Sequence, residues 1–380
     1  MATVDERVPE VLSGAQRAEA ERAGARAGTG AGPELPGLRR LRWPWFAAAL
    51  GVLAIAVVVG ASIGPVALPP SEILRSALAR IPFVHEVSGI STRDEAILWS
   101  LRMPRVVLAG LVGGMLALAG AAYQGVFRNP LADPYLLGAA AGAELGATIA
   151  IVVAPTAAVL GVQVVALAAF AGASLAVVGA FALGRSGRLG RNPTTLILAG
   201  VAVASFLTAI QTYVQQRQTG SMRQIYSWLL GRLVTAGWQG VWFVLPYVIV
   251  STVVILLHRR LLDALAVGDE ELGAMGVRVR RIRVVVIVAA TLGTAAAVSV
   301  GGAIAFIGII VPHTVRLVAG TTYRVVLPLS LVLGAAFLIL ADTVARTVIA
   351  PAELPIGVIT ALIGAPFFIV VMRTSREGAA

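Results

Sequence analysis

The stretch 101–138, "LRMPRVVLAGLVGGMLALAGAAYQGVFRNPLADPYLLG", joins a long apolar run to an abrupt polar turn. Residues 104–126 are apolar over a length that suits a membrane-spanning helix, which needs roughly 20 such residues. The turn that follows holds Arg128, Pro130 and Pro134 before a second apolar run. Proline fixes φ and lacks an N–H, so we expect a rigid reversal between two spans, with Asp133 capping the span that follows, the third of the chain.

The rest of the chain repeats this pattern of apolar blocks separated by short polar turns. Of 380 residues, 58% are hydrophobic and only 13% are charged, and the blocks do not alternate in polarity. This composition predicts an all-α polytopic membrane protein. The 41 glycines suit close approach of helices in lipid. We predict a disordered cytoplasmic tail over residues 1–42 and one transmembrane domain over 43–376, with spans at 44–66, 104–126, 134–154, 160–184, 195–216, 238–258, 282–300, 303–312, 325–345 and 355–372.

The eighth of these segments is too short to span a membrane in the usual way. It reads "GGAIAFIGIIVP", opened by a glycine pair and closed by Pro312. A short or broken helix buried among other helices fits it better than a lipid-facing helix.

The positions of the arginines predict the orientation of the chain across the membrane. Arginines are more frequent on the side that would hold the tail and residues 185–191, 259–283 and 373–376 than on the opposite side. The positive-inside rule therefore predicts that both termini are cytoplasmic. The net charge of +11 is spread over span ends, which suits anionic lipid and argues against nucleic acid as a partner. Two segments on the opposite side, within 67–98 and 220–231, have the spacing of short interfacial helices.

Residue types limit the chemistry of the chain. Cysteine is absent and all 30 basic residues are arginine, which excludes thiolate metal sites, the phosphate-binding lysine of a P-loop and Schiff-base chemistry. His85, His258 and His313 lie far apart in the sequence, so a metal site is not expected. No catalytic residue is predicted, and if ATP is used, another chain must hydrolyse it.

Besides Asp133, three acidic residues in or beside predicted spans are of interest. Glu144 lies within the third span, where it either faces a water-filled pathway or is protonated and hydrogen-bonded. Asp342 and Arg346 are four residues apart and are predicted to form an ion pair on one helix. Glu353, in "PAELP", is expected to be structural.

Five segments together resemble the permease subunits of ABC importers for iron complexes and cobalamin, the type II importers. They are 101–138, "LILAGVA" (196–202), "GAIAFIGIIVPHTVRL" (302–317), "LADTVAR" (340–346) and "AELPIGVITALIGAPFFI" (352–369). The resemblance runs in order from about residue 100 to residue 373. It implies ten helices per subunit, a homodimer with the pathway on its two-fold axis, and a location in the bacterial cytoplasmic membrane.

The resemblance also implies partners. Two ATPase subunits would hold ATP and magnesium on the cytoplasmic side, while this chain binds no cofactor. An extracytoplasmic substrate-binding protein would deliver an iron–siderophore, haem or cobalamin. Its glutamates would pair with arginines of two motifs, which correspond here to Arg102, Arg105 and Arg346; the alternative is that these arginines snorkel at span ends.

Further roles follow from the same resemblance. The cytoplasmic gate corresponds to Asn129, Pro130, Leu131, Pro193, Thr194 and Thr195. The pathway would be lined by the fifth span, including Gln211 and Tyr213, and Glu144 departs from the small or apolar residue expected there. Coupling to the ATPase is assigned to a short helix that begins at Pro312 and ends at Gly320, with Arg324 following. The residues with predicted coupling contacts are Pro312, His313, Arg316, Leu317, Gly320 and Arg324; the segment 268–281 is a second candidate for this contact or a solvated loop.

Two other classes of protein remain as alternatives. A proton-coupled carrier needs titratable groups along a path, for which Glu144, Asp342 and Glu353 are the candidates. A membrane enzyme needs a nucleophile–base pair or a metal cluster, and neither is visible in the sequence. We favour an importer of an iron complex, with cobalamin as the second cargo.

Overall fold

The computed structural model describes residues 43–64, 66–80, 91–154, 156–159, 162–185, 193–233, 237–265 and 268–377. The predicted tail, 1–42, and His85 lie outside these residues. Each predicted span overlaps a helix, although the predicted 303–312 shares only residues 307–312 with one. The described part of the chain has seven helices long and apolar enough to cross a membrane, together with three shorter apolar helices, so ten spans are not confirmed. The long helices are α2 (Trp43–Ser62), α5 (Met103–Phe127), α7 (Val164–Arg185), α8 (Pro193–Arg217), α10 (Gly237–Leu257), α13 (Val279–Gly301) and α15 (Tyr323–Ala345). The shorter apolar ones are α6 (Ala139–Val153), α14 (Ile307–Ala319) and the apolar part, Ile356–Val371, of α16 (Ile356–Glu377).

Smaller elements lie between these helices. Both predicted interfacial segments contain a helix, α3 in the first and α9 in the second. A two-stranded antiparallel hairpin, which the sequence did not predict, pairs Ala158 with Gln163. The smaller elements are α3 (Pro70–Ala79), α4 (Thr92–Ala96), η1 (Ile97–Arg102), β1 (Ala158–Val159), β2 (Val162–Gln163), η2 (Thr219–Ser221), α9 (Met222–Leu229), α11 (Arg259–Leu265) and α12 (Asp269–Ala274).

Helix α5 forms the centre of the packing. It contacts α15, α13, α14 and α10, and most of its residues are buried. Gly120 of α5 lies against the backbone of Gly308 in α14, where a Cβ would overlap the Gly308 carbonyl oxygen. Small residues therefore let α14 approach the central helix closely.

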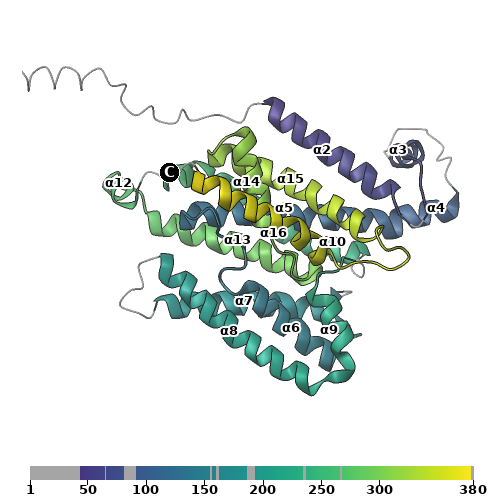
Figure 1. Cartoon of the computed structure of the whole chain (residues 1–380), viewed down its shortest axis with the longest axis horizontal. Helices are drawn as coiled ribbons and strands as arrows, with labels where there is room; N and C mark the ends of the chain where they lie inside the picture. The colour runs from purple at the N-terminus through teal and green to yellow at the C-terminus, as the bar shows by residue number, and fades with distance from the viewer. Residues whose placement is uncertain are drawn as a thin grey trace, which may run out of the picture. The chain divides into compact units, whose positions relative to one another are not determined.

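Helices α6, α7 and α8 form a second group that packs together beside α13 (Figure 1). Gly142 of α6 lies against the backbone of Gly172 in α7, a close approach of helices of the kind expected from the glycine content. Gly138 does not belong to this contact, because it precedes α6 with φ at 82° and lies against Gly200 of α8.

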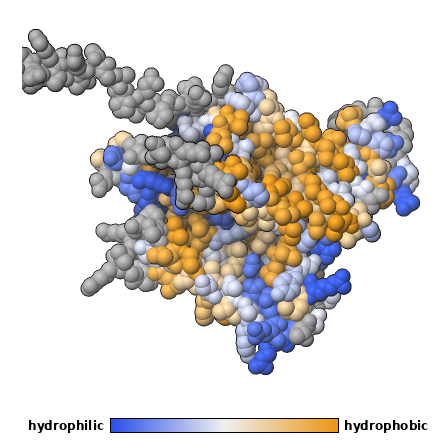
Figure 2. Space-filling view, in the orientation of Figure 1, coloured by the Kyte–Doolittle hydropathy of each residue, from blue (hydrophilic) through white to orange (hydrophobic). Residues whose placement is uncertain are grey.

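The face drawn in Figure 2 has an apolar middle and polar regions toward its ends. Helix α12 lies at one end and α3 and α4 lie at the other (Figure 1). We call these the Arg128 end and the Arg105 end, after the arginines at the two limits of α5.

Two predicted helix starts are wrong. Asp133 does not cap the third span, because its Oδ1 accepts a hydrogen bond from the N–H of Tyr135 at 2.8 Å within the turn, and α6 begins only at Ala139. Helix α14 does not begin at Pro312 but at Ile307, after Phe306 takes a left-handed conformation with φ at 70°. Pro312 therefore lies inside a continuous helix, which ends at Gly320 as predicted.

Candidate functional site: two polar ends and an intervening groove

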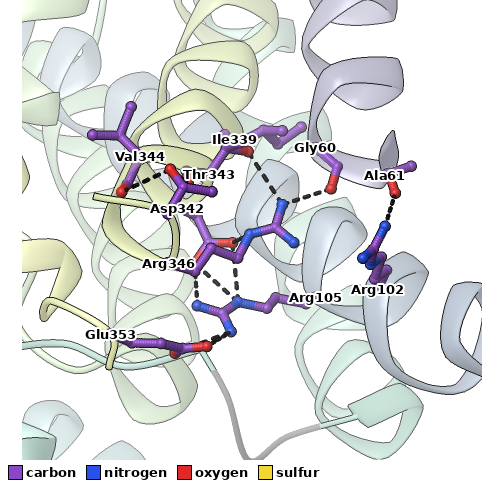
Figure 3. A network of polar contacts seen from close by, with 11 residues as sticks. Gly60, Ala61, Arg102, Arg105, Ile339, Asp342, Thr343, Val344, Arg346 and Glu353 are labelled. Carbon is purple, nitrogen blue, oxygen red and sulfur yellow. Dashed lines mark hydrogen bonds and ion pairs between the residues drawn. The ribbon is translucent and has the colours of Figure 1, made fainter. Parts of the chain in front are cut away.

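At the Arg105 end, one arginine joins two carboxylates from distant parts of the chain. Arg105 Nη2 lies 2.8 Å from Asp342 Oδ1, and its Nη1 lies 3.0 Å from Glu353 Oε1. Asp342 is 1% exposed and Glu353 is 32% exposed. Figure 3 shows the guanidinium of Arg105 between them. The buried Asp342 fixes the orientation of Arg105, while the partly exposed Glu353 is accessible to solvent.

The predicted ion pair on α15 is present within this network. Arg346 Nε lies 3.4 Å from Asp342 Oδ2, so Asp342 serves two arginines at once. The sequence predicted only the contact four residues apart, because the partner at Arg105 is 237 residues away.

Arg102 and Arg346 point toward the carboxyl end of α2 (Figure 3). Arg102 Nη1 donates to the carbonyl oxygen of Ala61 at 2.8 Å, and Arg346 Nη2 donates to that of Gly60 at 2.5 Å. Helix ends leave carbonyl groups without intrahelical partners and carry partial negative charge, so both cations are well placed there. Each residue is only 5% exposed. Of the three arginines predicted to meet a binding protein, only Arg105 therefore has a guanidinium beside an open pocket in this structure.

That pocket has a volume of about 290 Å³ and brings further charges to Arg105. Arg223, on α9, and Arg232, just after α9, line it together with Arg105 and Glu353. Sequence reasoning assigned no role to Arg223 or Arg232. The only signal in the sequence was their position in or directly after the predicted outer segment 220–231.

The turn after α5 lies against a spanning helix. Gly138 is packed on the backbone of Gly200 within α8, and the hydroxyl of Tyr135 donates to the carbonyl oxygen of Ile304 at 3.0 Å and accepts from its N–H at 3.2 Å. Within a membrane, non-helical backbone must have its hydrogen bonds satisfied and must be buried in protein or lie beside water. Tyr135 thus satisfies backbone groups of Ile304 in the non-helical segment between α13 and α14.

A groove of about 740 Å³ runs along α8 beside this turn. Asp133 and Tyr135 line one side, and Ser205, Thr208 and Thr212 of α8 line the other. Only 11% of the most apolar window of α8 is buried, compared with 83% for the segment containing α5. An open groove with hydroxyls and a carboxylate is poorly suited to contact with lipid tails.

The residues predicted to line the pathway do not share one face. Gln211 is 4% exposed and lies on the packed side of α8, whereas Tyr213 is 59% exposed. Residues two positions apart on a helix point roughly 200° apart, so only one of them can face the open side. Glu144 is partly buried on α6, and no hydrogen bond or ion pair joins it to another described residue.

At the Arg128 end, ion pairs hold the predicted gate turn against α12. We call the group formed by Arg128, Asp269 and Arg283 the clasp. Arg128 has φ at 50°, and its Nη2 lies 2.5 Å from Oδ1 of Asp269 on α12. Arg283 Nη1 lies 2.6 Å from Oδ2 of the same carboxylate. Within the turn, the N–H of Leu131 donates to Asn129 Oδ1 at 2.9 Å.

The remaining predicted gate residues belong to α8. Its first three residues are Pro193, Thr194 and Thr195, and the structure describes the side-chain environment only of Thr195, which is partly buried. Pro130 lines a pocket of about 270 Å³ together with Arg128 and Arg316.

The predicted coupling residues are mostly engaged within the chain. Arg316 Nη1 donates to Gln124 Oε1 at 2.6 Å, His313 lies 5.8 Å from Phe367 between ring centroids, and Arg324 Nε lies 3.3 Å from Asp263 Oδ2. Burial raises the pKa of Asp263, although its hydrogen bond from the Tyr323 N–H and its contact with Arg324 oppose this shift. Leu317, by contrast, is 71% exposed at this end.

No group of three histidine, cysteine, aspartate or glutamate side chains able to hold a metal ion occurs within the described ranges. The structure thus presents two charged ends and a groove beside α8.

Comparisons with known proteins agree with this architecture. The model of the FecCD transport family matches residues 52–374. The cobalamin import system permease protein BtuC of Halobacterium salinarum is 40% identical over 361 residues, covering 87% of this chain and 95% of that protein. The iron(3+)-hydroxamate import system permease protein FhuB of Bacillus subtilis is 38% identical over 282 residues, covering 74% of this chain and 72% of that protein.

A solved structure is similar over nearly the whole chain. It is an inward-facing conformation of a transporter described as being of the metal-chelate ABC type, with a TM-score of 0.72 and 28% identity, covering 87% of this chain and 98% of that one. The chain therefore belongs to the FecCD transport family, as a multi-pass permease component of an ABC importer.

Proposed function

We propose that this chain is the permease subunit of an ABC importer that moves an iron complex, a siderophore or haem, into the cytoplasm. It works as a homodimer with ten spans per subunit. Two separate ATPase subunits hold ATP and magnesium, and a substrate-binding protein delivers the cargo. This proposal rests on the family membership together with the groove on α8.

The groove supports a pathway because hydroxyls and a carboxylate lie among the apolar residues that line it, in a region otherwise suited to lipid. Ser205, Thr208 and Thr212 expose hydroxyls, and Asp133 adds a carboxylate. Helix α8 is long and apolar enough to span the membrane but has little cover within its own chain. A second copy of the chain facing this helix would enclose the groove and remove its polar groups from lipid.

The two ends of the molecule suit different partners. The Arg128 end, with α11, α12 and the exposed Leu317, is assigned to the cytoplasm and to the ATPase. Asn129, Pro130, Leu131 and the start of α8 then form the exit gate across the dimer axis. The Arg105 end faces outward, where its guanidinium groups attract an acidic partner.

Cargo identity is the finer part of the proposal. The FhuB relative is a permease for iron(3+)-hydroxamate import and the BtuC relative is a permease for cobalamin import, at similar identity. Both cargoes are bulky metal chelates, which suits a wide groove with few charged groups. Cobalamin is therefore the second candidate, supported by the 40% identity of its permease.

Two single substitutions at neighbouring positions, compared with each other, test the pathway. Ser205→Trp fills the groove and should abolish uptake in proteoliposomes that contain the whole transporter, while ATP hydrolysis persists. Phe206→Trp is the matched control, because Phe206 is exposed on α8 but does not line the groove. The pathway assignment would be contradicted if both variants lost uptake equally, or if neither variant lost uptake.

The cargo is tested on the binding protein that supports uptake. Titrating it with haem, ferric hydroxamate siderophores and cobalamin should give the tightest binding for an iron complex. Tightest binding of cobalamin would select the second candidate.

A further inference from the structure

A second groove, of about 490 Å³, lies between α2 and α10. Helix α2 packs on α15, and α10 packs on α13 and α5, so α5 and α15 form the floor between them (Figure 1). The described residues that line the groove are apolar or glycine, except Thr252 on α10. We call this space the α2–α10 groove. It differs in kind from the groove on α8, which is lined by several hydroxyls and a carboxylate.

The α2–α10 groove is elongated along the helices. On α10, Ile249 and Val253 are four positions apart and therefore lie on one face of the helix. On α15, the lining extends from Leu331 to Ile339, which at 1.5 Å per residue corresponds to a floor about 12 Å long. An elongated apolar groove matches the shape and the chemistry of a hydrocarbon chain.

The groove reaches from the surface of the bundle into its core. Ile249 and Val253 at the rim are 52% and 51% exposed, whereas Val106 and Ile339 on the floor are 1% and 2% exposed. Gly110 of α5 also lines the floor, where a Cβ would lie 3.5 Å from Cδ1 of Ile339, an ordinary contact distance. The missing side chain at Gly110 thus leaves space that a larger residue could fill without displacing the backbone.

The membrane location of the chain limits what can occupy this space. Water does not fill a cavity with apolar walls, and an empty groove would forfeit the van der Waals contacts of its lining. If a methylene group takes about the space of a water molecule, roughly 30 Å³, the groove holds on the order of 16 of them. This is the size of a lipid acyl chain. Helix α8, which the proposed dimer would cover, supplies no residue to the described lining.

We propose that the α2–α10 groove binds an acyl chain of a membrane lipid, which fills the space between these helices and supports α2 against the bundle. Helix α2 needs such support, because only 22% of its most apolar window is buried within the chain. Its carboxyl end is fixed by Arg102 and Arg346, while its middle borders the groove at Leu53 and Val57. The inference needs only the membrane location of the chain and is independent of the cargo.

Occupancy is tested with a phospholipid that carries a photoreactive diazirine in its acyl chain. The whole complex is labelled in detergent with a small molar excess of this lipid, so that bulk lipid is scarce and a bound lipid is retained by mass action. Ile249 should carry at least about threefold more label than Val250, because bound lipid lies only in the groove. Val250 is the matched control, since it is the next residue on α10 and is also 52% exposed, but does not line the groove. Equal labelling of the two residues would overturn the proposal.

Filling the groove gives a second measurement. Gly110→Leu should lose most of the label at Ile249, raise the thermal unfolding midpoint in lipid-free detergent, and reduce the further rise that added phospholipid produces. Gly51→Leu is the control, because nothing lies near a Cβ at Gly51 on α2 and this residue does not line the groove. The same response to lipid in both variants would contradict a bound acyl chain.

A substitution at the rim covers the case in which Gly110→Leu fails to assemble. Val253→Trp should block labelling at Ile249, whereas Val250→Trp, at a position of similar exposure outside the groove, should not. Unchanged labelling in Val253→Trp would overturn the proposal. Absence of label in the unmodified complex, together with disulfide crosslinks between Val253→Cys subunits, would instead show that a second copy of the chain occupies the groove.

Discussion

Asp342 on α15 accepts hydrogen bonds from Arg105 at the start of α5 and lies 3.4 Å from Arg346 on its own helix. The buried carboxylate thus joins the central helix to its main packing partner and fixes the orientation of two cations. Removing one member of such a group leaves the others buried without a counter-charge.

Asp342→Ala should therefore lower the free energy of unfolding by about 3 kcal/mol. Glu353→Gln is the control on the same arginine, and because Glu353 is partly exposed its effect should stay below about 1 kcal/mol. Thermal unfolding of both variants in detergent measures the difference. Equal destabilisation would show that the buried carboxylate has no special role.

The contact between Gly142 and Gly172 makes a second prediction. Gly142→Ala places a methyl group against the carbonyl of Gly172 and should destabilise the protein by roughly 2 kcal/mol, because α6 and α7 must separate. Gly51→Ala is the matched control, since nothing lies near a Cβ at that helical position. Unfolding midpoints measured side by side should fall for Gly142→Ala alone; a comparable fall for both would refute this packing role.

The clasp at the Arg128 end predicts a change in mobility more than in stability. Asp269→Asn weakens the contacts to Arg128 and Arg283, which are partly exposed, so unfolding should change by less than about 1 kcal/mol. A spin label attached to Leu131→Cys should nevertheless become more mobile, because Arg128 no longer holds the turn to α12. Glu271→Gln on the same helix should leave the label unchanged, and similar spectra for the two variants would contradict the clasp.

The proposed gate predicts proximity across the dimer. The chain has no native cysteine, so Asn129→Cys or Leu131→Cys introduces a single reactive site per subunit. These cysteines should form intersubunit crosslinks when the exit is closed and lose them when it opens during the ATP cycle. Absence of crosslinks in every nucleotide state would show that the turn is not a gate.

Much of the helical architecture could be predicted from the sequence, because apolar runs of sufficient length specify helices in a membrane. Helix starts were harder to predict where the backbone leaves the regular pattern within an apolar run. Ile304, Phe306 and Tyr135 illustrate this: the start of α14 depends on a left-handed residue and on a tyrosine hydroxyl supplied from the turn after α5. Such contacts depend on tertiary structure and leave no local signature.

The site was predictable in its residue types but not in its pairings. Arginines at the Arg105 end were visible in the sequence, yet the burial of Arg102 and Arg346 depends on where α2 ends in space. The role of Arg105 depends on Asp342 and Glu353, which lie 237 and 248 residues away. Hydropathy could not separate Gln211 from Tyr213, since packing of the neighbouring helices decides which side of α8 is open.

The source of energy for uptake distinguishes an ABC importer from a proton-coupled carrier. The permease should be reconstituted in proteoliposomes with its ATPase subunits and binding protein, and uptake of a radiolabelled ferric siderophore, haem or cobalamin measured with ATP inside the vesicles or with an imposed pH gradient. We predict uptake that requires ATP, the ATPase subunits and the binding protein, and that persists when the pH gradient is collapsed. Uptake driven by a pH gradient through the permease alone would contradict the account.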